Sequence, residues 1–491
     1  MSTDQIFIPE FSIMKKIIQR IEKYGIWILL FLWFLISCFR VWYFVYATVP
    51  LWYDPGMYKE IFTQYIQVLQ HMNFDVLSGW IRHEPLLWII AALLHNIGIS
   101  FDWLITWGIG IMNLVPGLLL FWFLKSRKQT RVGLLAALLY RTSIVQYEVF
   151  WWGYFKQTIG VSLMILILLF REQKKLFLQS ILFFLLILLH RHTAVFTWIL
   201  LGILVLHAWF QHKRFPWKTI MYLSIAGICA LLLYIPLRSR VMPEAIKAVA
   251  TTFWWDSNWG DFMNILIYLK LQWPILLLSL FGAWTKIKEK KIDGWLLWYI
   301  VAEIRILCSL VNFNRTIVFL DIFVIVFAAR ALIEIIRMSK KMWLLYVWML
   351  FACIFCIWNS IHYLWYVADR NIPLISEEEF TSIKSLNSIL EKDAIVMNTH
   401  RNYSPWIMWR SQRAYINPGM SDMDMWTHAK WNQRRANDGR IKCTMLKQTY
   451  APLQRPLYIW MWEQQFTENI LWWDCFSLVS DGTTWKLYRI F

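Results

Sequence analysis

The sequence predicts a polytopic α-helical membrane protein that ends in a small domain of mixed helix and strand. Three observations carry this prediction. Of the 491 residues, 59% are hydrophobic and only 16% are charged. Apolar stretches of about 20 residues, the length that crosses the hydrocarbon core of a bilayer, recur over most of the chain. After residue 364 the chain becomes polar. Together with a mean hydropathy of +0.45, these features exclude a disordered chain and an ordinary soluble fold.

We expect about 11–13 transmembrane helices within residues 26–364. The apolar stretches are 26–47, 103–124, 132–147, 156–170, 176–190, 194–210, 219–237, 261–284, 295–311, 316–333 and 342–364. A further apolar segment, 84–99, is short. We interpret it as a helix that dips into the membrane from outside or lies along it, because a full crossing there would break the alternation of the charged connections.

The net charge of +18 is distributed unevenly over the polar connections. One set contains 21 basic residues: the N-terminus 1–25, 125–131, 171–175, 211–218, 286–291 and 334–341. The alternating set contains 8: 50–83, 148–156, 190–193, 238–260 and 311–315. The positive-inside rule places the first set in the cytoplasm. We therefore expect a multi-pass protein of the cell (cytoplasmic or inner) membrane with a cytoplasmic N-terminus and an extracytoplasmic domain at 365–491. The net positive charge then indicates how the protein is oriented in the lipid membrane, and it does not indicate a nucleic-acid partner.

The C-terminal segment contains the pattern of a small α/β domain. Ser376-Glu377-Glu378-Glu379 predicts a capping box that opens a helix to about Glu391. Stretches rich in β-branched and aromatic residues at 393–399, 456–462 and 484–490 predict strands. A basic cluster beside Trp426 and Trp431 is either a solvated face or a site for lipid headgroups or an anionic acceptor: Lys430, Arg434, Arg435, Arg440 and Lys442. Whether Cys443 and Cys475 pair is left open.

The first external loop, 50–83, supplies a candidate catalytic carboxylate. Asp54 follows the first apolar stretch and precedes Pro55 and Gly56, which favour a rigid turn. Apolar residues then recur at helical spacing, as in a helix that lies in the membrane interface: Met57, Ile61, Phe62, Tyr65, Val68 and Leu69. The turn would hold a carboxylate at the boundary of water and lipid, although Asp-Pro-Gly is also a common turn starter.

Other polar residues cluster at predicted external ends of helices. They are His83, Glu84, Glu148, Lys156, His190, Arg191, His192 and Arg315. Each has an ordinary interpretation, such as a partner for a helix dipole or part of an interfacial belt. Together, a carboxylate and several cations on one membrane face suit a reaction that deprotonates a hydroxyl and expels an anionic phosphate.

The order of these motifs resembles the GT-C class of membrane glycosyltransferases, which includes protein O-mannosyltransferases, aminoarabinose transferases acting on lipid A, and oligosaccharyltransferases. The resemblance covers most of the chain. It rests on these motifs: Asp54 after the first helix, Glu84-Pro85-Leu86, Glu148 in the second external loop, Asn314-Arg315-Thr316-Ile317 leading to Phe327-Ala328-Ala329, and Asp393-Ala394-Ile395-Val396 and Gly482-Thr483-Thr484-Trp485 in the tail.

The resemblance implies a polyprenyl-phosphate-linked sugar donor and transfer to a hydroxyl or amine of a lipid, glycan or protein acceptor on the extracytoplasmic face. Asp54 would be the general base and Arg315 would neutralise the donor phosphate. The remaining candidates would contact substrate: Tyr58, His83, Glu84, Glu148, Lys156, His190, Arg191 and His192. No cofactor is certain. Whether Asp54 and Glu148 bind a divalent cation, Mg or Mn, is left open. Metal-using members of the class often have Asp at the position of Glu148.

Two other functions compete. A transporter or a flippase for lipid-linked glycans would place charges along a path through the membrane, and candidates exist within the apolar stretches: Arg40, Arg141, Lys270 and Arg305. However, the sequence shows no repeat of related halves. A glycan polymerase or ligase would carry its chemistry in a large loop between helices, whereas most external residues here follow the last apolar stretch.

Overall fold

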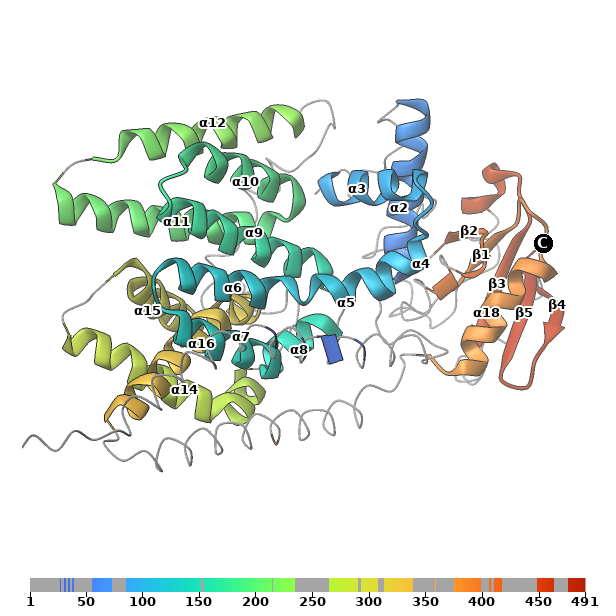
Figure 1. Cartoon of the computed structure of the whole chain (residues 1–491). Coiled ribbons are helices and arrows are strands. Elements are labelled where there is room, and N and C mark those ends of the chain that lie inside the picture. Colours follow the sequence, from blue (N-terminus) through green and yellow to red (C-terminus); the bar gives the residue numbers. More distant parts are fainter. Residues whose placement is uncertain are drawn as a thin grey trace, which may run out of the picture. The chain divides into compact units, whose positions relative to one another are not determined.

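The computed structural model of the chain (Figure 1) describes most of the helical region and part of the C-terminal segment. The described residues are 55–72, 85–151, 154–213, 215–234, 265–289, 293–307, 313–338, 375–398, 410–416, 448–462 and 476–490, with single positions at 27, 31, 34, 35, 38, 358, 406 and 407. They form two compact units. The helix unit comprises Met1–Trp42, Arg82–Leu87 and Thr106–Val367, and the mixed unit comprises Tyr43–Ile81, Trp88–Ile105 and Ala368–Phe491.

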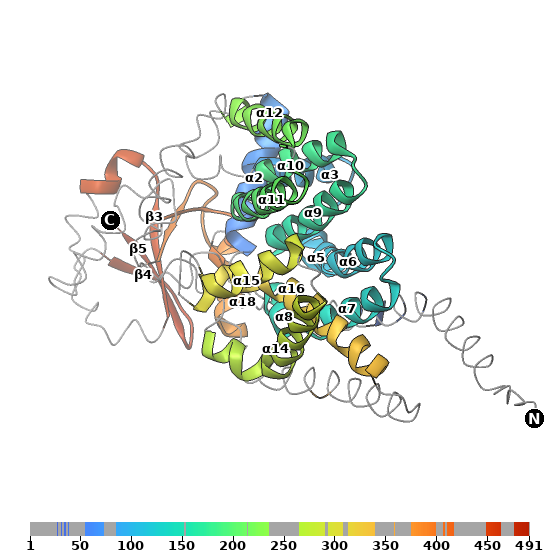
Figure 2. The same ribbon diagram turned by 90° about the vertical axis from the view of Figure 1, so that its left-hand side faces the viewer.

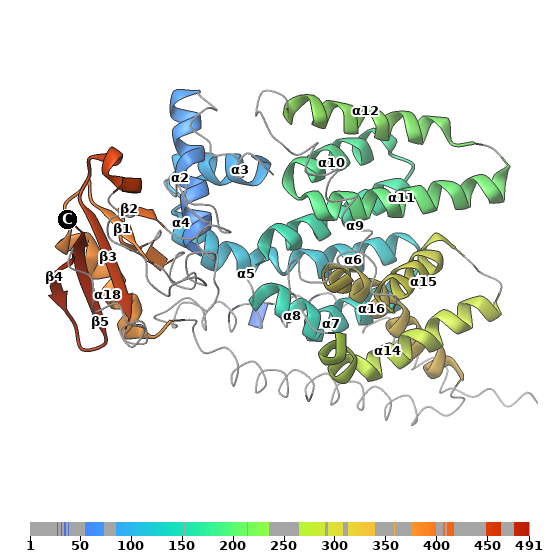
Figure 3. The same cartoon turned by 180° about the vertical axis from the view of Figure 1, so that it is seen from behind.

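The helix unit is a set of helices packed side by side, several of them seen nearly end-on in Figure 2. They are α5 (Ile109–Met112), α6 (Val115–Ser126), α7 (Thr130–Thr142), α8 (Ile144–Trp151), α9 (Phe155–Glu172), α10 (Leu176–Leu189), α11 (Arg191–His212), α12 (Trp217–Tyr234), α14 (Ile265–Lys288), α15 (Gly294–Leu307) and α16 (Phe313–Met338). α10 contacts α9 and α12, while α16 contacts α7, α14 and α15 (Figure 3). Most residues of Thr316–Ile335 in α16 are buried, so α16 forms the centre of the unit.

Four described helical stretches are long and apolar enough to cross a membrane: Ile109–Ser126, His192–Gln211, Ile265–Lys288 and Thr316–Ile335. Large apolar side chains such as Trp198 on α11, Trp217 on α12 and Trp273 on α14 are exposed, which is the arrangement expected of lipid-facing surfaces. The predicted spans 26–47 and 342–364 fall almost entirely outside the described residues.

Two of the predicted spans are not regular α-helices throughout. The stretch 132–147 divides at Ser143, whose ψ of 128° is extended, into α7 and α8. The Ser143 hydroxyl donates to the Asp321 carboxylate at 2.7 Å and accepts from the Gln146 N–H at 3.4 Å, so side-chain bonding replaces helical continuity. The stretch 103–124 contains a π-helical turn at Leu104–Gly108 and a short turn at Asn113, where α5 continues into α6 with helical backbone angles.

Connections that the charge pattern assigned to one side of the membrane meet in the structure. Asp293, before α15, pairs with Lys286 of α14 and lies 3.5 Å from Arg127 after α6. Arg330 of α16 contacts Glu289 at 3.0 Å. The connections 125–131 and 286–291 therefore share one end of the helix unit, as expected of loops on one membrane face.

The mixed unit contains α2 (Pro55–His71), most of α3 (Pro85–Asn96) and α4 (Phe101–Trp103). Of the apolar stripe that was expected to face the membrane interface, Ile61, Phe62, Tyr65 and Val68 are buried by protein, so these four side chains do not face lipid. The ring of Phe62 lies 4.9 Å from that of Phe101 and 5.3 Å from that of His95, and Tyr65 is fully buried. The 12 residues of α3 rise about 18 Å, less than the hydrocarbon thickness, which fits the short helix expected at 84–99.

The C-terminal part of the mixed unit is a five-stranded sheet with α18 (Glu377–Ile389) across it (Figure 1). The strands are β1 (Ile395–Met397), β2 (Ala414–Ile416), β3 (Leu457–Trp462), β4 (Phe476–Asp481) and β5 (Trp485–Ile490), in the order β2-β1-β3-β5-β4. β1 is parallel to β2 and β3, whereas β5 is antiparallel to β3 and β4. The predicted helix, its capping box and three strands are confirmed. The sequence patterns missed β2 and β4.

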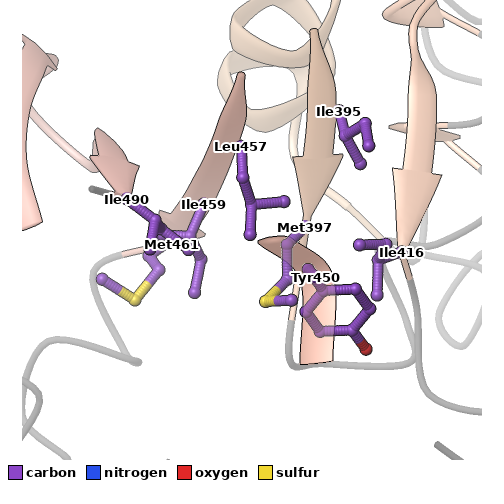
Figure 4. Packing of buried hydrophobic residues seen from close by; sticks show 8 residues of the cluster. All are labelled: Ile395, Met397, Ile416, Tyr450, Leu457, Ile459, Met461 and Ile490. Atoms are coloured by element: carbon purple, nitrogen blue, oxygen red, sulfur yellow. The ribbon is translucent and has the colours of Figure 1, made fainter. Parts of the chain in front are cut away.

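The alternation of side chains along β1 and β3 builds a hydrophobic core on one face of this sheet (Figure 4). Its buried members are Ile395, Met397, Ile416, Tyr450, Leu457, Ile459, Met461 and Ile490. The core joins the parallel and antiparallel halves of the sheet, so the C-terminal segment has a hydrophobic core of its own.

Candidate functional site

The N-terminal ends of α9 and α11 lie against each other because Gly160 has no side chain. A Cβ atom at Gly160 would stand 2.8 Å from Oγ1 of Thr193, closer than atoms in contact normally approach. Gly160 is in the second turn of α9 and Thr193 is in the first turn of α11. The N-terminal ends of the two helices therefore meet at one end of the helix unit.

His190 is the N-cap of α11 and is buried, with 7% of its surface exposed. Its Nδ1 lies 2.6 Å from the Thr193 hydroxyl and accepts the Thr193 backbone N–H at 3.4 Å. A ring nitrogen that accepts a backbone N–H carries no proton, so the described contacts favour the tautomer protonated at Nε2. The ring of His192, which is exposed, lies 5.8 Å away. Among the residues that were predicted to be cationic, His190 therefore caps the N-terminal end of α11 through its contacts with Thr193.

Lys156 and Glu148 flank the same end of the helix unit. Lys156 precedes Gly160 by one turn of α9 and therefore shares its face of the helix. Glu148 lies in α8, which contacts α9. Both side chains are half-buried.

Arg315 belongs to the first turn of α16, although its side chain lies outside what the structure describes, as does that of Arg191. One turn further along α16, the ring of Phe319 stacks on Phe196 of α11 with centroids 4.0 Å apart. The start of α16 therefore lies beside the start of α11. Three helices, α9, α11 and α16, direct their N-terminal ends to one region of the helix unit. Unsatisfied N–H groups and the helix dipoles make such a region favourable for an anion.

A buried polar network lies beneath this region. Asp321 of α16 is fully buried, and its Oδ2 accepts from the Ser143 hydroxyl at 2.7 Å and from Gln146 Nε2 at 2.9 Å. Gln146 also donates to the Val318 carbonyl at 3.3 Å, and Gln272 of α14 donates to Ser143 Oγ at 3.2 Å. The network joins α8, α14 and α16 near the ends that carry Glu148 and Arg315.

The candidates drawn from the sequence did not include Asp321. A signal was available, because a lone carboxylate inside an apolar span is expensive in a membrane and usually has a specific partner. The partners themselves could not be read from the sequence, since Ser143 and Gln146 are 178 and 175 residues away along the chain.

The remaining candidates are not joined to this region by the described residues. Asp54, His83 and Glu84 lie outside the described part of the chain. Tyr58 is in the mixed unit, where it is 4% exposed and its ring lies 5.3 Å from that of Trp88. Within the described ranges, no group of three or more His, Cys, Asp or Glu side chains could hold a metal ion. The described residues alone therefore provide no centre for Mg or Mn, and the part of Asp54 and Glu148 in binding a metal stays a prediction.

The two charged residues that were candidates for a transport path and have described side chains, Arg141 and Lys270, do not share one environment. Arg141 is 3% exposed and donates to Asn113 Oδ1 at 2.9 Å, which ties α7 to the turn between α5 and α6. Lys270 is exposed on α14. Arg40 lies outside the described residues, as does the side chain of Arg305.

Known structures share this architecture over nearly the whole chain. No protein-family model matches the sequence, and no curated protein sequence matches it. The apo oligosaccharyltransferase of Archaeoglobus fulgidus is 12% identical with a TM-score of 0.59, covering 92% of this chain and 71% of that one. ArnT of Cupriavidus metallidurans in the apo state is 9% identical with a TM-score of 0.58, covering 94% of this chain and 97% of that one.

The chain has the GT-C fold. It is a polytopic membrane protein with a small C-terminal sheet domain, as the sequence predicted. ArnT has also been solved bound to undecaprenyl phosphate, and in that form it is 8% identical to this chain with a TM-score of 0.57. At such identities the similarity concerns the GT-C fold, and any assignment of chemistry depends on residues of this chain.

Proposed function

We propose that this GT-C protein is a glycosyltransferase that moves a sugar from a polyprenyl-phosphate-linked donor to an acceptor hydroxyl or amine on the extracytoplasmic face of the cell membrane. The observation that carries the proposal is the meeting of α9, α11 and α16 at their N-terminal ends, where Lys156, Arg191 and Arg315 are located. The GT-C fold, shared with a transferase solved with undecaprenyl phosphate, supports it.

The leaving group of such a reaction is an anionic lipid phosphate. Helix N-termini and basic side chains stabilise a phosphate both when it is bound and as its charge grows during bond breaking. Lys156, Arg191 and Arg315 would hold this phosphate, with His190 fixing the first turn of α11 and His192 at its edge. Removal of one charge-assisted contact costs about 1.5–3 kcal/mol, or roughly a ten- to hundredfold decrease in kcat/KM.

The acceptor needs a base. As the bond to the lipid phosphate breaks, the anomeric carbon gains positive charge and the acceptor hydroxyl loses its proton late in the transition state. Asp54 is proposed as that base, because it directly precedes Pro55, the residue at which α2 begins. Tyr58, His83, Glu84 and Glu148 are proposed to contact donor or acceptor. Lipid, glycan and protein acceptors all fit this chemistry.

The test is transfer by the full-length purified protein in lipid nanodiscs, supplied with a panel of polyprenyl-phosphate sugars. Wild type should release polyprenyl phosphate and form a glycosylated product. Asp54→Asn should abolish transfer, and Lys156→Gln should lower kcat/KM about ten- to hundredfold. Lys174→Gln is the matched control, since Lys174 is an exposed lysine in the turn after α9, at the other end of that helix.

Full transfer by Asp54→Asn, at wild-type expression and thermal stability, would remove Asp54 from the mechanism. Equal losses in Lys156→Gln and Lys174→Gln would remove the anion site from the end of α9. Movement of the labelled lipid across the membrane without any glycosylated product would favour the flippase.

A further inference from the structure

The C-terminal sheet domain has a pocket that the proposed transfer reaction does not use. It lies between α18 and the first residue of β5, has a volume of about 590 Å³, and opens to solvent. It is lined by Glu377, Glu378, Thr381, Ser382, Ser385 and Trp485, and most of the surface that it presents is apolar. The pocket therefore combines the indole of Trp485 with side chains along one face of α18, where the Ser382 and Ser385 hydroxyls already donate to backbone carbonyls of the helix.

The indole of Trp485 is held in place by the turn that precedes it. A Cβ atom at Gly482 would stand 2.2 Å from Nε1 of Trp485, so the indole occupies the space that any other residue at position 482 would fill. The Gly482 N–H donates to the Trp485 carbonyl at 2.9 Å, which closes the hairpin between β4 and β5. Trp485 remains half-buried and lines the pocket.

The polar wall is also fixed. The carboxylate of Glu378 accepts from the Thr483 hydroxyl at 2.6 Å and from the Thr484 hydroxyl, which attaches the hairpin to α18. These hydrogen bonds, that of Thr483 first, lower the pKa of Glu378 below its ordinary value, so the carboxylate is ionised at neutral pH. Glu377 and Thr381 are exposed beside it, and Ser385 is half-buried one turn beyond Thr381.

This set of groups selects among ligands. The ionised carboxylate of Glu378 disfavours a phosphate or another anion, so the lipid-phosphate donor does not fit here. Carboxylate and hydroxyl oxygens accept hydrogen bonds from adjacent hydroxyls, and the negative face of an indole attracts weakly positive C–H groups. A pyranose ring presents both features, with hydroxyls at its rim and C–H bonds on its face.

We propose that this pocket binds a neutral pyranose unit of a glycan, stacked on Trp485 and hydrogen-bonded by Glu377 and Glu378. The site would give the C-terminal domain a carbohydrate-binding role separate from sugar transfer. It would retain a glycan chain near the membrane surface whether or not that chain is the acceptor. Because sugar binding is measured without donor or turnover, the proposal does not depend on the proposed function.

The experiment uses the full-length protein in nanodiscs and three neutral probes: maltotriose, mannotriose and N-acetylchitotriose. Ligand-observed saturation-transfer NMR and calorimetry avoid the signal of the 34 tryptophans. At least one probe should bind to wild type. Trp485→Ala should raise its Kd at least about tenfold, whereas Trp485→Phe, which keeps an aromatic face, should stay within about fivefold.

A second variant protects the test against misfolding. Thr381→Arg places a long side chain in the pocket from an exposed helical position and should abolish binding without lowering Tm. Leu478→Ala, at an exposed position of the same hairpin outside the pocket, is the matched control and should bind as wild type does.

The proposal is overturned if no neutral probe binds at 10 mM, a limit of about 3 kcal/mol in affinity. It is also overturned if binding persists in both Trp485→Ala and Thr381→Arg. Binding of spermidine in the absence of any sugar binding would show a cation site instead. Sugar binding that survives Asp54→Asn, with transfer lost, would separate this pocket from the catalytic site.

Discussion

Two aspartates of the helix unit, Asp293 and Asp321, have opposite kinds of surroundings. Asp293 stands in the connection before α15, pairs with Lys286, lies 3.5 Å from Arg127, and accepts the Leu296 N–H at 3.0 Å. Asp321 stands inside α16 and accepts from the neutral side chains of Ser143 and Gln146.

The two sites differ in what a carboxylate can contribute. Burial by itself would raise the pKa of Asp293, but Lys286, the Leu296 N–H and Arg127 together lower it below its ordinary value. The side chain is 26% exposed, so water screens its ion pairs and limits their contribution to stability. Asp321 is fully buried, and loss of its oxygens would leave buried donors without partners.

The two ends of the helix unit are therefore held together by different kinds of interaction. Opposite charges join the connections at the end that carries Asp293. Hydrogen bonds between a carboxylate and neutral groups fix α8, α14 and α16 near the candidate anion site. The ion pairs can form in the presence of water. The buried hydrogen-bond network forms only when α8, α14 and α16 are all correctly positioned.

The largest effect is expected at Asp321. Asp321→Leu removes the acceptor for Ser143 and Gln146 and should destabilise the protein by about 2–5 kcal/mol, with loss of sugar transfer. Thermal unfolding in detergent and the transfer assay measure the two effects. Asp321→Asn keeps one acceptor oxygen and should retain at least half of the wild-type transfer. Equal stability of Asp321→Leu and wild type would show that the network is not needed to hold α8, α14 and α16 in place.

A smaller effect is expected where α9 and α11 meet. Gly160→Ala forces Thr193 away and disturbs the His190 cap, so we expect a cost of about 1–3 kcal/mol and a lower kcat/KM. The matched control is Gly202→Ala on α11, because a Cβ there meets no atom within 4 Å and alanine favours the helix. If both variants behave alike in thermal unfolding and in transfer, close approach of the two helix ends is not needed for activity.

The smallest effect is expected at Asp293. Asp293→Asn should cost about 1 kcal/mol at pH 7 and leave transfer by the folded protein unchanged. Because the folded pKa of Asp293 lies below its ordinary value of 3.8, its contribution is present above that pH and disappears as the pH falls through the folded pKa. Wild type should therefore lose more stability than Asp293→Asn below about pH 4. Parallel pH profiles of Tm for the two proteins would refute the ion-pair account.

The sequence by itself determined the features that depend on local pattern. Hydropathy located the described helices from α9 to α16 to within a few residues, and the capping box at Ser376 located the start of α18. The alternation of basic connections predicted that 125–131 and 286–291 share one end, where Asp293 joins them. These signals are readable because each arises from neighbouring residues or from the composition of a single connection.

Only the tertiary structure decided how distant elements meet. The apolar stripe of α2 packs against α3 and α4, since those helices offer it a surface that a helical periodicity cannot identify. The break at Ser143 depends on Asp321, 178 residues away, and the approach of α9 to α11 depends on Gly160 opposite Thr193. The pocket beside Trp485 likewise needs α18 and a hairpin about a hundred residues later. Such contacts are set by packing between distant segments, which no local pattern in the sequence records.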